Sequence, residues 1–170
     1  MAITNKIISN LWFNTEAEEA ARFYTSIFKN SHIGRISRYG KEGFEIHGMP
    51  EGSVMTIEFF LEGQPFLGLN GGPHFKFNES ISFIIMCESQ EEIDYYWNKL
   101  GEGGDKNAQQ CGWLKDKFGL SWQVVPAIIA EAMTDPDHAK SERVMKEVMQ
   151  MKKLDLDKIK AAYEGHLAEA

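Results

Sequence analysis

The residues best suited to chemistry in this chain of 170 amino acids lie between Gln110 and Pro126, in the stretch QCGWLKDKFGLSWQVVP. Cys111 has Lys115 four residues further on, and a neighbouring cation can lower a thiol pKa enough to make a nucleophile. A free cysteine is more often a small buried hydrophobic residue, and we favour that interpretation here. Trp113 and Trp122 could offer aromatic platforms to a ligand, although tryptophan more often belongs to the core.

A second candidate for chemistry is His74, in the segment GGPHFKFN. Imidazole changes its charge near neutral pH, and a flexible turn next to the end of a predicted strand would give it freedom to act as an acid or a base. The alternative is an ordinary exposed loop histidine, which is the commoner case. Four further histidines have no spacing typical of metal ligands: His32, His47, His138 and His166.

Composition restricts the classes of function. Hydrophobic residues make up 43% of the chain and aromatic residues 12%, as in a folded globular protein of one domain with an appendage. The net charge is −7, with acidic and basic residues interspersed, whereas nucleic-acid binding requires a basic patch. We therefore expect no nucleic-acid partner.

The chain also lacks the patterns of membrane insertion and of a disulfide framework. No apolar run reaches the length of a membrane span, and the first residues, MAITNKIISN, have neither the basic region nor the apolar core of a signal peptide. The two cysteines, Cys87 and Cys111, form no CxxC pair. We expect a cytoplasmic protein without membrane contact, with both thiols reduced.

Hydrophobic periodicity places the elements that would position these residues. Short apolar or alternating runs predict strands over 6–13, 32–39, 53–61, 64–69 and 81–87. A turn at Glu62-Gly63 should join two of them as a hairpin. Two predicted helices begin with capping boxes, one at Thr15 with Glu18 and one at Ser89 with Glu92. Their predicted buried faces are Ala17, Ala20, Ala21, Tyr24, Ile27 and Phe28 in the first helix, and Ile93, Tyr96, Trp97 and Leu100 in the second.

An internal repeat sets the architecture. A shift of 73 positions aligns two segments without gaps, so that Ser9 falls on Ser82 and Leu11 on Ile84. The helix faces also agree, and Gly119 matches Gly63 in the closing hairpins. Each repeat is therefore predicted to contain a strand, a helix and about three more strands. One half-curled sheet cannot bury both faces, so we expect two βαβββ modules that pair around a pocket, in an α+β fold.

A doubled βαβββ module with this spacing resembles the vicinal oxygen chelate superfamily of glyoxalases, bleomycin-resistance proteins and extradiol dioxygenases. Three long motifs are similar to the PhnB-like, demethylubiquinone methyltransferase-like branch of that superfamily: LWFNTEAEEAARFYTSIF, GQPFLGLNGGPHFKFNESISF and QCGWLKDKFGLSWQVVP. The resemblance extends over roughly the whole chain. By analogy with the superfamily, it implies a homodimer.

The resemblance also implies where a metal would bind. Metal-using members carry His or Glu ligands on the first and last strand of each module, and the matching positions here are Ser9, Ser82, Leu67 and Gln123. None of these residues is His, Asp or Glu, and serine and glutamine are weak metal ligands without carboxylates. We therefore expect no metal and no cofactor, and a pocket in which Ser9, Ser82 and Gln123 orient a small ligand or are satisfied within a packed interior. The predicted pocket lining is Ser9, Leu11, Phe13, Leu67, Ser82, Ile84, Cys111, Trp113 and Gln123.

Three hypotheses for function follow. The leading one is a small-molecule-binding protein of PhnB-like type without the superfamily's metal site. The second is an enzyme of unknown reaction that uses Gln123, the serines and His74, and the third is a structural dimer with a filled pocket. Methyl transfer from S-adenosylmethionine is disfavoured, because no GxGxxG occurs and Gly71-Gly72 precedes a proline rather than a helix.

After Pro126 the pattern changes to helices. The expected domains are a paired domain over 1–126, with modules of about 1–74 and 75–126, and a helical extension over 127–170. Helices are predicted from Ile128, from Asp135-Pro136 with the proline at the first helical position, and from Asp155. The second should bury Val144, Met145, Val148 and Met149, and the third Ile159, Ala162 and Tyr163.

Overall fold

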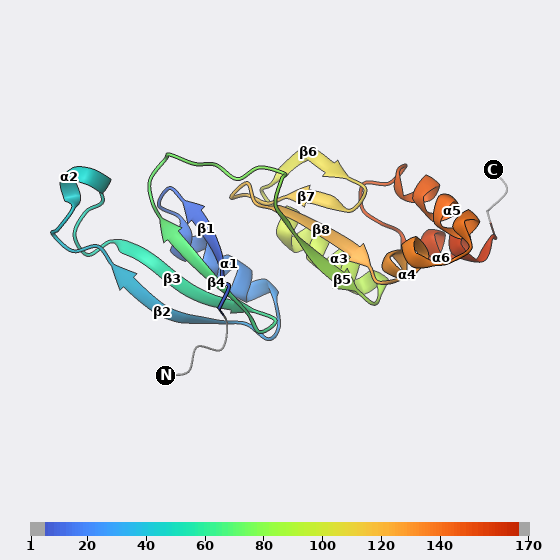
Figure 1. The fold of residues 1–170 in the computed structure, drawn as a ribbon, viewed down its shortest axis with the longest axis horizontal. Coiled ribbons are helices and arrows are strands. Elements are labelled where there is room, and N and C mark those ends of the chain that lie inside the picture. The colour runs from blue at the N-terminus through green and yellow to red at the C-terminus, as the bar shows by residue number, and fades with distance from the viewer. Residues whose placement is uncertain (1–5, 167–170) are drawn as a thin grey trace. The chain divides into compact units, whose positions relative to one another are not determined.

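The computed structural model describes residues 6–166 and divides them into two compact units, of which the second begins at Asn78 (Figure 1). Each unit contains a four-stranded mixed sheet with a helix on one face, as the repeat predicts. No helix in this described range is long and apolar enough to cross a membrane.

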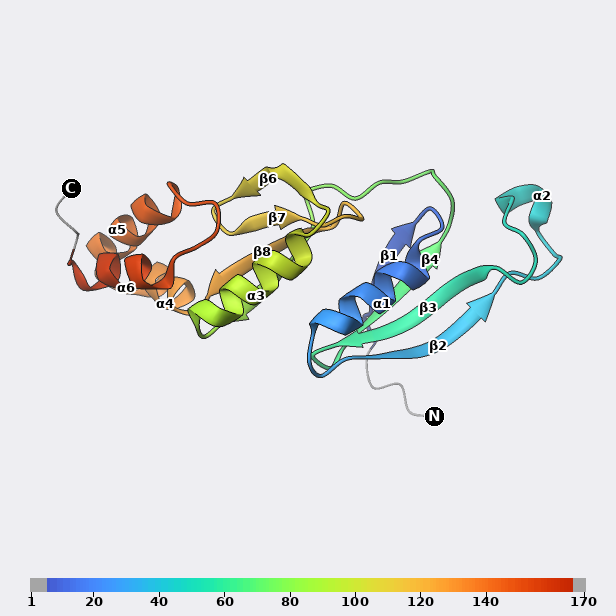
Figure 2. The same ribbon diagram turned by 180° about the vertical axis from the view of Figure 1, so that it is seen from behind.

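Unit 1 has the sheet order β1-β4-β3-β2, with β1 parallel to β4 and the other pairs antiparallel. The helix α1 lies across one face of this sheet (Figure 2), and its buried alanines allow a close approach to β4. The elements are β1 (Ser9–Phe13), α1 (Ala17–Ile27), β2 (His32–Arg38), α2 (Phe44–His47), β3 (Val54–Leu61) and β4 (Gln64–Asn70). The predicted hairpin is confirmed, and Glu62 and Gly63 both have positive φ, as its tight turn requires.

Unit 2 repeats this arrangement in the order β5-β8-β7-β6, with β5 parallel to β8. The predicted face of α3 is confirmed, because Ile93, Tyr96, Trp97 and Leu100 are all buried. The elements are β5 (Ser82–Cys87), α3 (Gln90–Gly101), β6 (Asp105–Gln110), β7 (Trp113–Lys115) and β8 (Ser121–Pro126). Strand β6, with the sequence DKNAQQ, has no apolar alternation to predict it, because it lies at the sheet edge and is mostly exposed.

The structure confirms one predicted capping box and corrects the other. Ser89 accepts a hydrogen bond from the backbone N–H of Glu92 at 3.2 Å, as predicted. The box at Thr15 was wrong, because the residue that precedes α1 is Glu16 and no side chain there caps the helix. Instead the buried Asn70 of β4 accepts from the N–H of Ala17 at 2.8 Å, so a long-range contact replaces a local one.

The ungapped alignment of the two repeats was also wrong in its strands. Phe13 opposes Asn70 in the parallel pair of unit 1, and its equivalent in unit 2 is Cys87, opposite Pro126. The strands therefore match with a shift of 74, whereas the helices match with a shift of 73. The reason is that three residues (14–16) join β1 to α1, while two (88–89) join β5 to α3. Since side chains alternate along a strand, this single residue reverses which face each predicted residue of β1 occupies.

Three helices follow β8: α4 (Ile128–Thr134), α5 (His138–Val148) and α6 (Leu156–Glu164). The helix predicted from Pro136 begins two residues later, because Asp137 is the residue that caps it. Met145 and Met149 are 37% and 64% exposed, so their predicted burial was wrong: α5 buries one narrow stripe instead. The helices share a core of Ala132, Val144, Val148, Leu154, Ile159 and Ala162, against which Tyr163 packs partly buried.

The extension is fixed to the rest of unit 2 by backbone contacts. The N–H groups of Cys111 and Gly112 donate to the carbonyls of Met151 and Lys152, each at 2.8 Å. Gln90, at the start of α3, accepts from the N–H of Leu156 at 2.8 Å. These contacts make the β6–β7 turn and the N-terminus of α3 a docking surface for the C-terminal helices.

Candidate ligand-binding face

The open face of the second sheet gathers several of the predicted site residues. Trp122 and Val124 of β8 are buried on the side of α3, so Gln123 between them points away from the helix. The strand register places Trp113 of β7 and Ile84 of β5 beside Gln123, one on each side. Three side chains from three strands therefore form one row across this face.

Two polar side chains near the middle of the face are joined by a hydrogen bond. The amide Nε2 of Gln123 donates to the hydroxyl oxygen Oγ of Ser82 at 2.8 Å, and both residues are half-buried. An amide and a hydroxyl can each donate and accept, and the strands fix their positions. The pair can therefore hold one polar group of a small molecule.

Apolar side chains surround this pair. Ile84 and Met86 of β5 are 57% and 50% exposed, a large exposure for aliphatic residues in the middle of a strand. Val125 of β8 opposes Met86 on the same face, and Trp113 is half-buried beside Gln123. The arrangement of few polar groups within an apolar surface is typical of small-molecule sites.

A cation lies at one end of the face. Lys115 of β7 is two residues from Trp113, so both share the open side, and its side chain is 23% exposed. Its ammonium group donates to the carboxylate of Glu79, which is 63% exposed and precedes β5. This contact lowers the pKa of Glu79 below its ordinary value, chiefly through the hydrogen bond.

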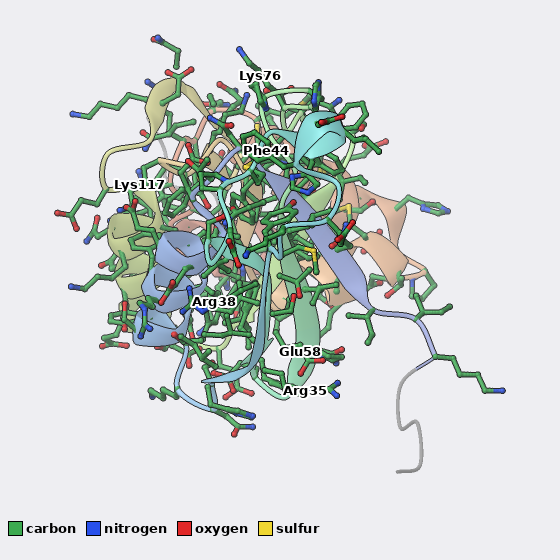
Figure 3. The ribbon with its side chains drawn as sticks, turned by 90° about the vertical axis from the view of Figure 1, so that its left-hand side faces the viewer. Arg35, Arg38, Phe44, Glu58, Lys76 and Lys117 are labelled. Atoms are coloured by element: carbon green, nitrogen blue, oxygen red, sulfur yellow. The ribbon has the colours of Figure 1, made fainter. Side chains whose placement is uncertain are left out.

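The corresponding face of unit 1 is more polar. Glu58 of β3 pairs with Arg35 of β2 through contacts of 2.5 and 2.8 Å (Figure 3), and this hydrogen bonding lowers the pKa of Glu58. Ser37 and Thr56 share a hydrogen bond of 2.6 Å beside this pair. In Figure 3, Phe44 marks the short helix α2, which lies in the loop between these two strands.

The predicted pocket residues divide into two groups. Ser82, Ile84, Trp113 and Gln123 share the open face of unit 2, and Leu67 lies on the open face of unit 1, opposite Glu58. Ser9, Leu11 and Phe13 instead share the side of Phe66, Gly68 and Asn70, which faces α1. Leu11 and Phe13 are 6% and 4% exposed, so they belong to the core under the helix. Their placement in a pocket followed from the ungapped repeat and is corrected with it.

The two candidates for direct chemistry lie elsewhere. Cys111 occupies the tight β6–β7 turn with a φ of 51° and packs against the C-terminal helices, away from the row of Gln123. His74 is exposed and follows β4 in unit 1, beside Gly72. Cys111 therefore does not belong to the cluster around Ser82, and His74 is a residue of unit 1.

Within residues 6–166, no group of three or more His, Cys, Asp or Glu side chains is placed to hold a metal ion. The donors of the open face in unit 2 are a hydroxyl and an amide, and Leu67 fills the position in unit 1 that matches Gln123. A hydroxyl and an amide are by themselves weak ligands for a catalytic divalent metal, which proteins usually hold through imidazole, thiolate or carboxylate groups.

Sequence reasoning missed three members of this face: Met86, Lys115 and Val125. Alternation alone could have found them, because each lies two residues from a predicted site residue on its own strand. The position of Glu79 beside Lys115 had no signal, since Glu79 lies outside any strand and the two are 36 residues apart.

Comparison with known proteins gives a consistent family. Residues 5–125 match the family model described as 3-demethylubiquinone-9 3-methyltransferase. The chain is similar to the structure of a Bacillus cereus PhnB protein described by the same activity, with 38% identity and a TM-score of 0.61 over 72% of this chain and 100% of that one. No curated protein sequence matches.

A more distant structure shares the fold, and a weaker match follows it. Protein PA1353 from Pseudomonas aeruginosa has 18% identity and a TM-score of 0.54, over 72% of this chain and 98% of its own. The fosfomycin resistance protein FosX from Listeria monocytogenes has 17% identity and a TM-score of 0.48, over 79% and 100%. The family model ends at residue 125, so helices α4 to α6 lie beyond it.

Proposed function

Since the chain belongs to the PhnB-like, 3-demethylubiquinone-9 3-methyltransferase family of the vicinal oxygen chelate superfamily, we propose that it is a small-molecule-binding protein. We place the binding site on the open face of the sheet β5–β8. In this proposal the ligand lies on Ile84, Met86, Trp113 and Val125. One of its polar groups is held by Gln123 and Ser82.

The observation that carries the proposal is the bond between Gln123 and Ser82 in apolar surroundings. Polar side chains on an otherwise apolar sheet face contribute little to packing, whereas a fixed amide and hydroxyl give a ligand orientation and specificity. The equivalent positions of unit 1 are Leu67 and Ile8, which have no such groups. The polar pair is thus a particular feature of unit 2.

We propose that this ligand is bound without the superfamily's metal. Gln123 stands on the closing strand, where metal-using relatives carry a carboxylate, and a neutral amide oxygen binds a divalent cation weakly without carboxylate partners. The hydroxyl of Ser82 is also a poor ligand at neutral pH. Hydrogen bonding by the same two groups is the chemistry that they perform well.

The family's printed description raises methyl transfer as the alternative. Transfer from S-adenosylmethionine usually relies on a glycine-rich turn between a strand and a helix, which holds the cofactor at the helix N-terminus. Here the connections from β1 to α1 and from β5 to α3, residues 14–16 and 88–89, contain no glycine, and the glycine-containing connection 39–43 leads only to the short helix α2. Small-molecule binding is therefore the better supported function.

Native mass spectrometry of the untagged, gently purified chain tests the proposal. We expect a non-covalent organic adduct on the wild type that is reduced in Gln123→Leu, with the polypeptide forming a homodimer. Added S-adenosylmethionine should leave the spectrum unchanged. A wild-type spectrum without adduct after purification from several growth conditions would contradict ligand binding, and stoichiometric S-adenosylmethionine would favour methyl transfer instead.

A further inference from the structure

The open face of unit 2 changes in polarity along its strands. The strand register produces three rows: Lys115, Ser121 and Ser82; then Trp113, Gln123 and Ile84; then Val125 and Met86. Neighbouring rows on one face are two residues apart, or about 7 Å. Ser121 is buried, so the face begins with a cation and the hydroxyl of Ser82, continues with an amide beside an indole ring, and ends with aliphatic side chains.

Lys115 is held over this face rather than directed to solvent. Its side chain is only 23% exposed. It lies on β7 two residues from Trp113, so both side chains are on the same face of the sheet. Its ion pair with Glu79, which lies shortly before β5, holds the ammonium group at this edge of the face. The polar end of the face is thus also its positively charged end.

The carboxylate that pairs with Lys115 belongs to an exposed residue. Glu79 is 63% exposed and lies in a turn outside any helix or strand. An exposed ion pair contributes little to stability, so this carboxylate can be displaced by another. Without a ligand, the Glu79 carboxylate therefore occupies the anion site that Lys115 provides at the end of the face.

We propose that the ligand of this face is an amphipathic carboxylate, a small molecule with an aromatic or aliphatic body and one terminal acid group. The acid replaces Glu79 on Lys115, Gln123 and Ser82 meet a polar group in the middle, and the body lies on Trp113, Ile84 and Met86. This inference rests on the proposed function and adds the chemical class of the ligand.

The test compares two probes that differ only in charge, 4-phenylbutyrate and its neutral amide, 4-phenylbutanamide, by isothermal titration calorimetry. The wild type should bind the acid about three- to tenfold more tightly than the amide, the range expected of one partly exposed charge pair. Raising the salt concentration should weaken binding of the acid and leave that of the amide unchanged.

Two variants with opposite expected effects test the role of the charge. Lys115→Met should bring the affinity for the acid down to that for the amide. Glu79→Gln, which removes the competing carboxylate from an exposed position, should strengthen binding of the acid about threefold. Lys117→Met makes the same charge change in the neighbouring turn, where the residue is exposed, and should alter neither affinity.

The outcomes distinguish the two proposals. Equal binding of acid and amide, unaffected by Lys115→Met and Glu79→Gln, would overturn the carboxylate inference and leave ligand binding by the face intact. Absence of binding by either probe, together with a native mass spectrum free of adducts, would overturn both.

Discussion

Replacement of Asn70 tests how unit 1 holds its helix against its sheet. The side chain of Asn70 is buried, its Oδ1 accepts from the N–H of Ala17 at 2.8 Å, and its Nδ2 donates to the carbonyl of Val54 at 3.0 Å. In Asn70→Ala both bonds are lost, and a buried donor and a buried acceptor are left without their partner. Such groups cost about 1–3 kcal/mol each, so we expect the free energy of unfolding to fall by about 2–6 kcal/mol.

The matched control is Thr15→Ala, which removes the cap that the sequence predicts. Thr15 is exposed and its side chain does not cap α1, so this change should alter stability by no more than about 0.5 kcal/mol. Urea unfolding followed by far-ultraviolet circular dichroism gives both values, and hydrogen exchange at the amide of Ala17 should accelerate in Asn70→Ala alone. A larger loss in Thr15→Ala than in Asn70→Ala would refute the reasoning.

Three further predictions concern unit 2. In Gln90→Ala the extension loses hydrogen bonds at Leu154 and Leu156, so the free energy of unfolding in urea should fall by about 1–3 kcal/mol. The exposed Asn98→Ala on the same helix should lower it by at most about 0.5 kcal/mol, and equal effects would argue against Gln90 as the attachment. Tyr163 donates a hydrogen bond of 2.6 Å to Asp135, and this bond is the main cause that lowers the pKa of Asp135 from 3.8 to about 2. The stabilisation that the bond provides is therefore complete above about pH 4 and is lost as the pH falls towards 2. The difference in melting temperature between wild type and Tyr163→Phe should vanish at acid pH, and a constant difference would contradict this origin. Burial raises the pKa of the Cys87 thiol to about 12, so iodoacetamide at pH 8 should modify the half-buried Cys111 first in the native protein. If mass spectrometry finds Cys87 modified equally fast, burial does not protect the Cys87 thiol.

Local sequence patterns predicted the elements well, because they report burial within one segment. The buried face of α3, the cap at Ser89 and the hairpin at Glu62-Gly63 all depend on residues a few positions apart, and all three are confirmed. The edge strand β6 gave no signal because it buries little apolar surface. The exposed Met149 was misplaced because periodicity alone does not show how wide a stripe the neighbouring helices cover.

Contacts between distant segments limited the prediction of the site. The cap of α1 comes from Asn70, more than fifty residues away, and no local motif indicates it. The faces of β1 depended on the length of one connection, and the additional residue in 14–16 moved Ser9, Leu11 and Phe13 to the helix side. Alignment of the last strand residues, Phe13 and Cys87, would have revealed the offset, since both directly precede a polar connection. The register of β5, β8 and β7 places Ser82, Ile84, Trp113 and Gln123 on one face, because the shift in the repeat does not alter the faces within unit 2.

Two serines provide the most direct test of the binding face. Ser82 contacts Gln123 on the open side of unit 2, whereas Ser9 lies on the helix side of unit 1. The dissociation constant of the compound that copurifies with the chain should therefore increase severalfold in Ser82→Ala and remain unchanged in Ser9→Ala. Equal affinity in wild type and Ser82→Ala, or a loss confined to Ser9→Ala, would contradict binding on the open face of β5–β8.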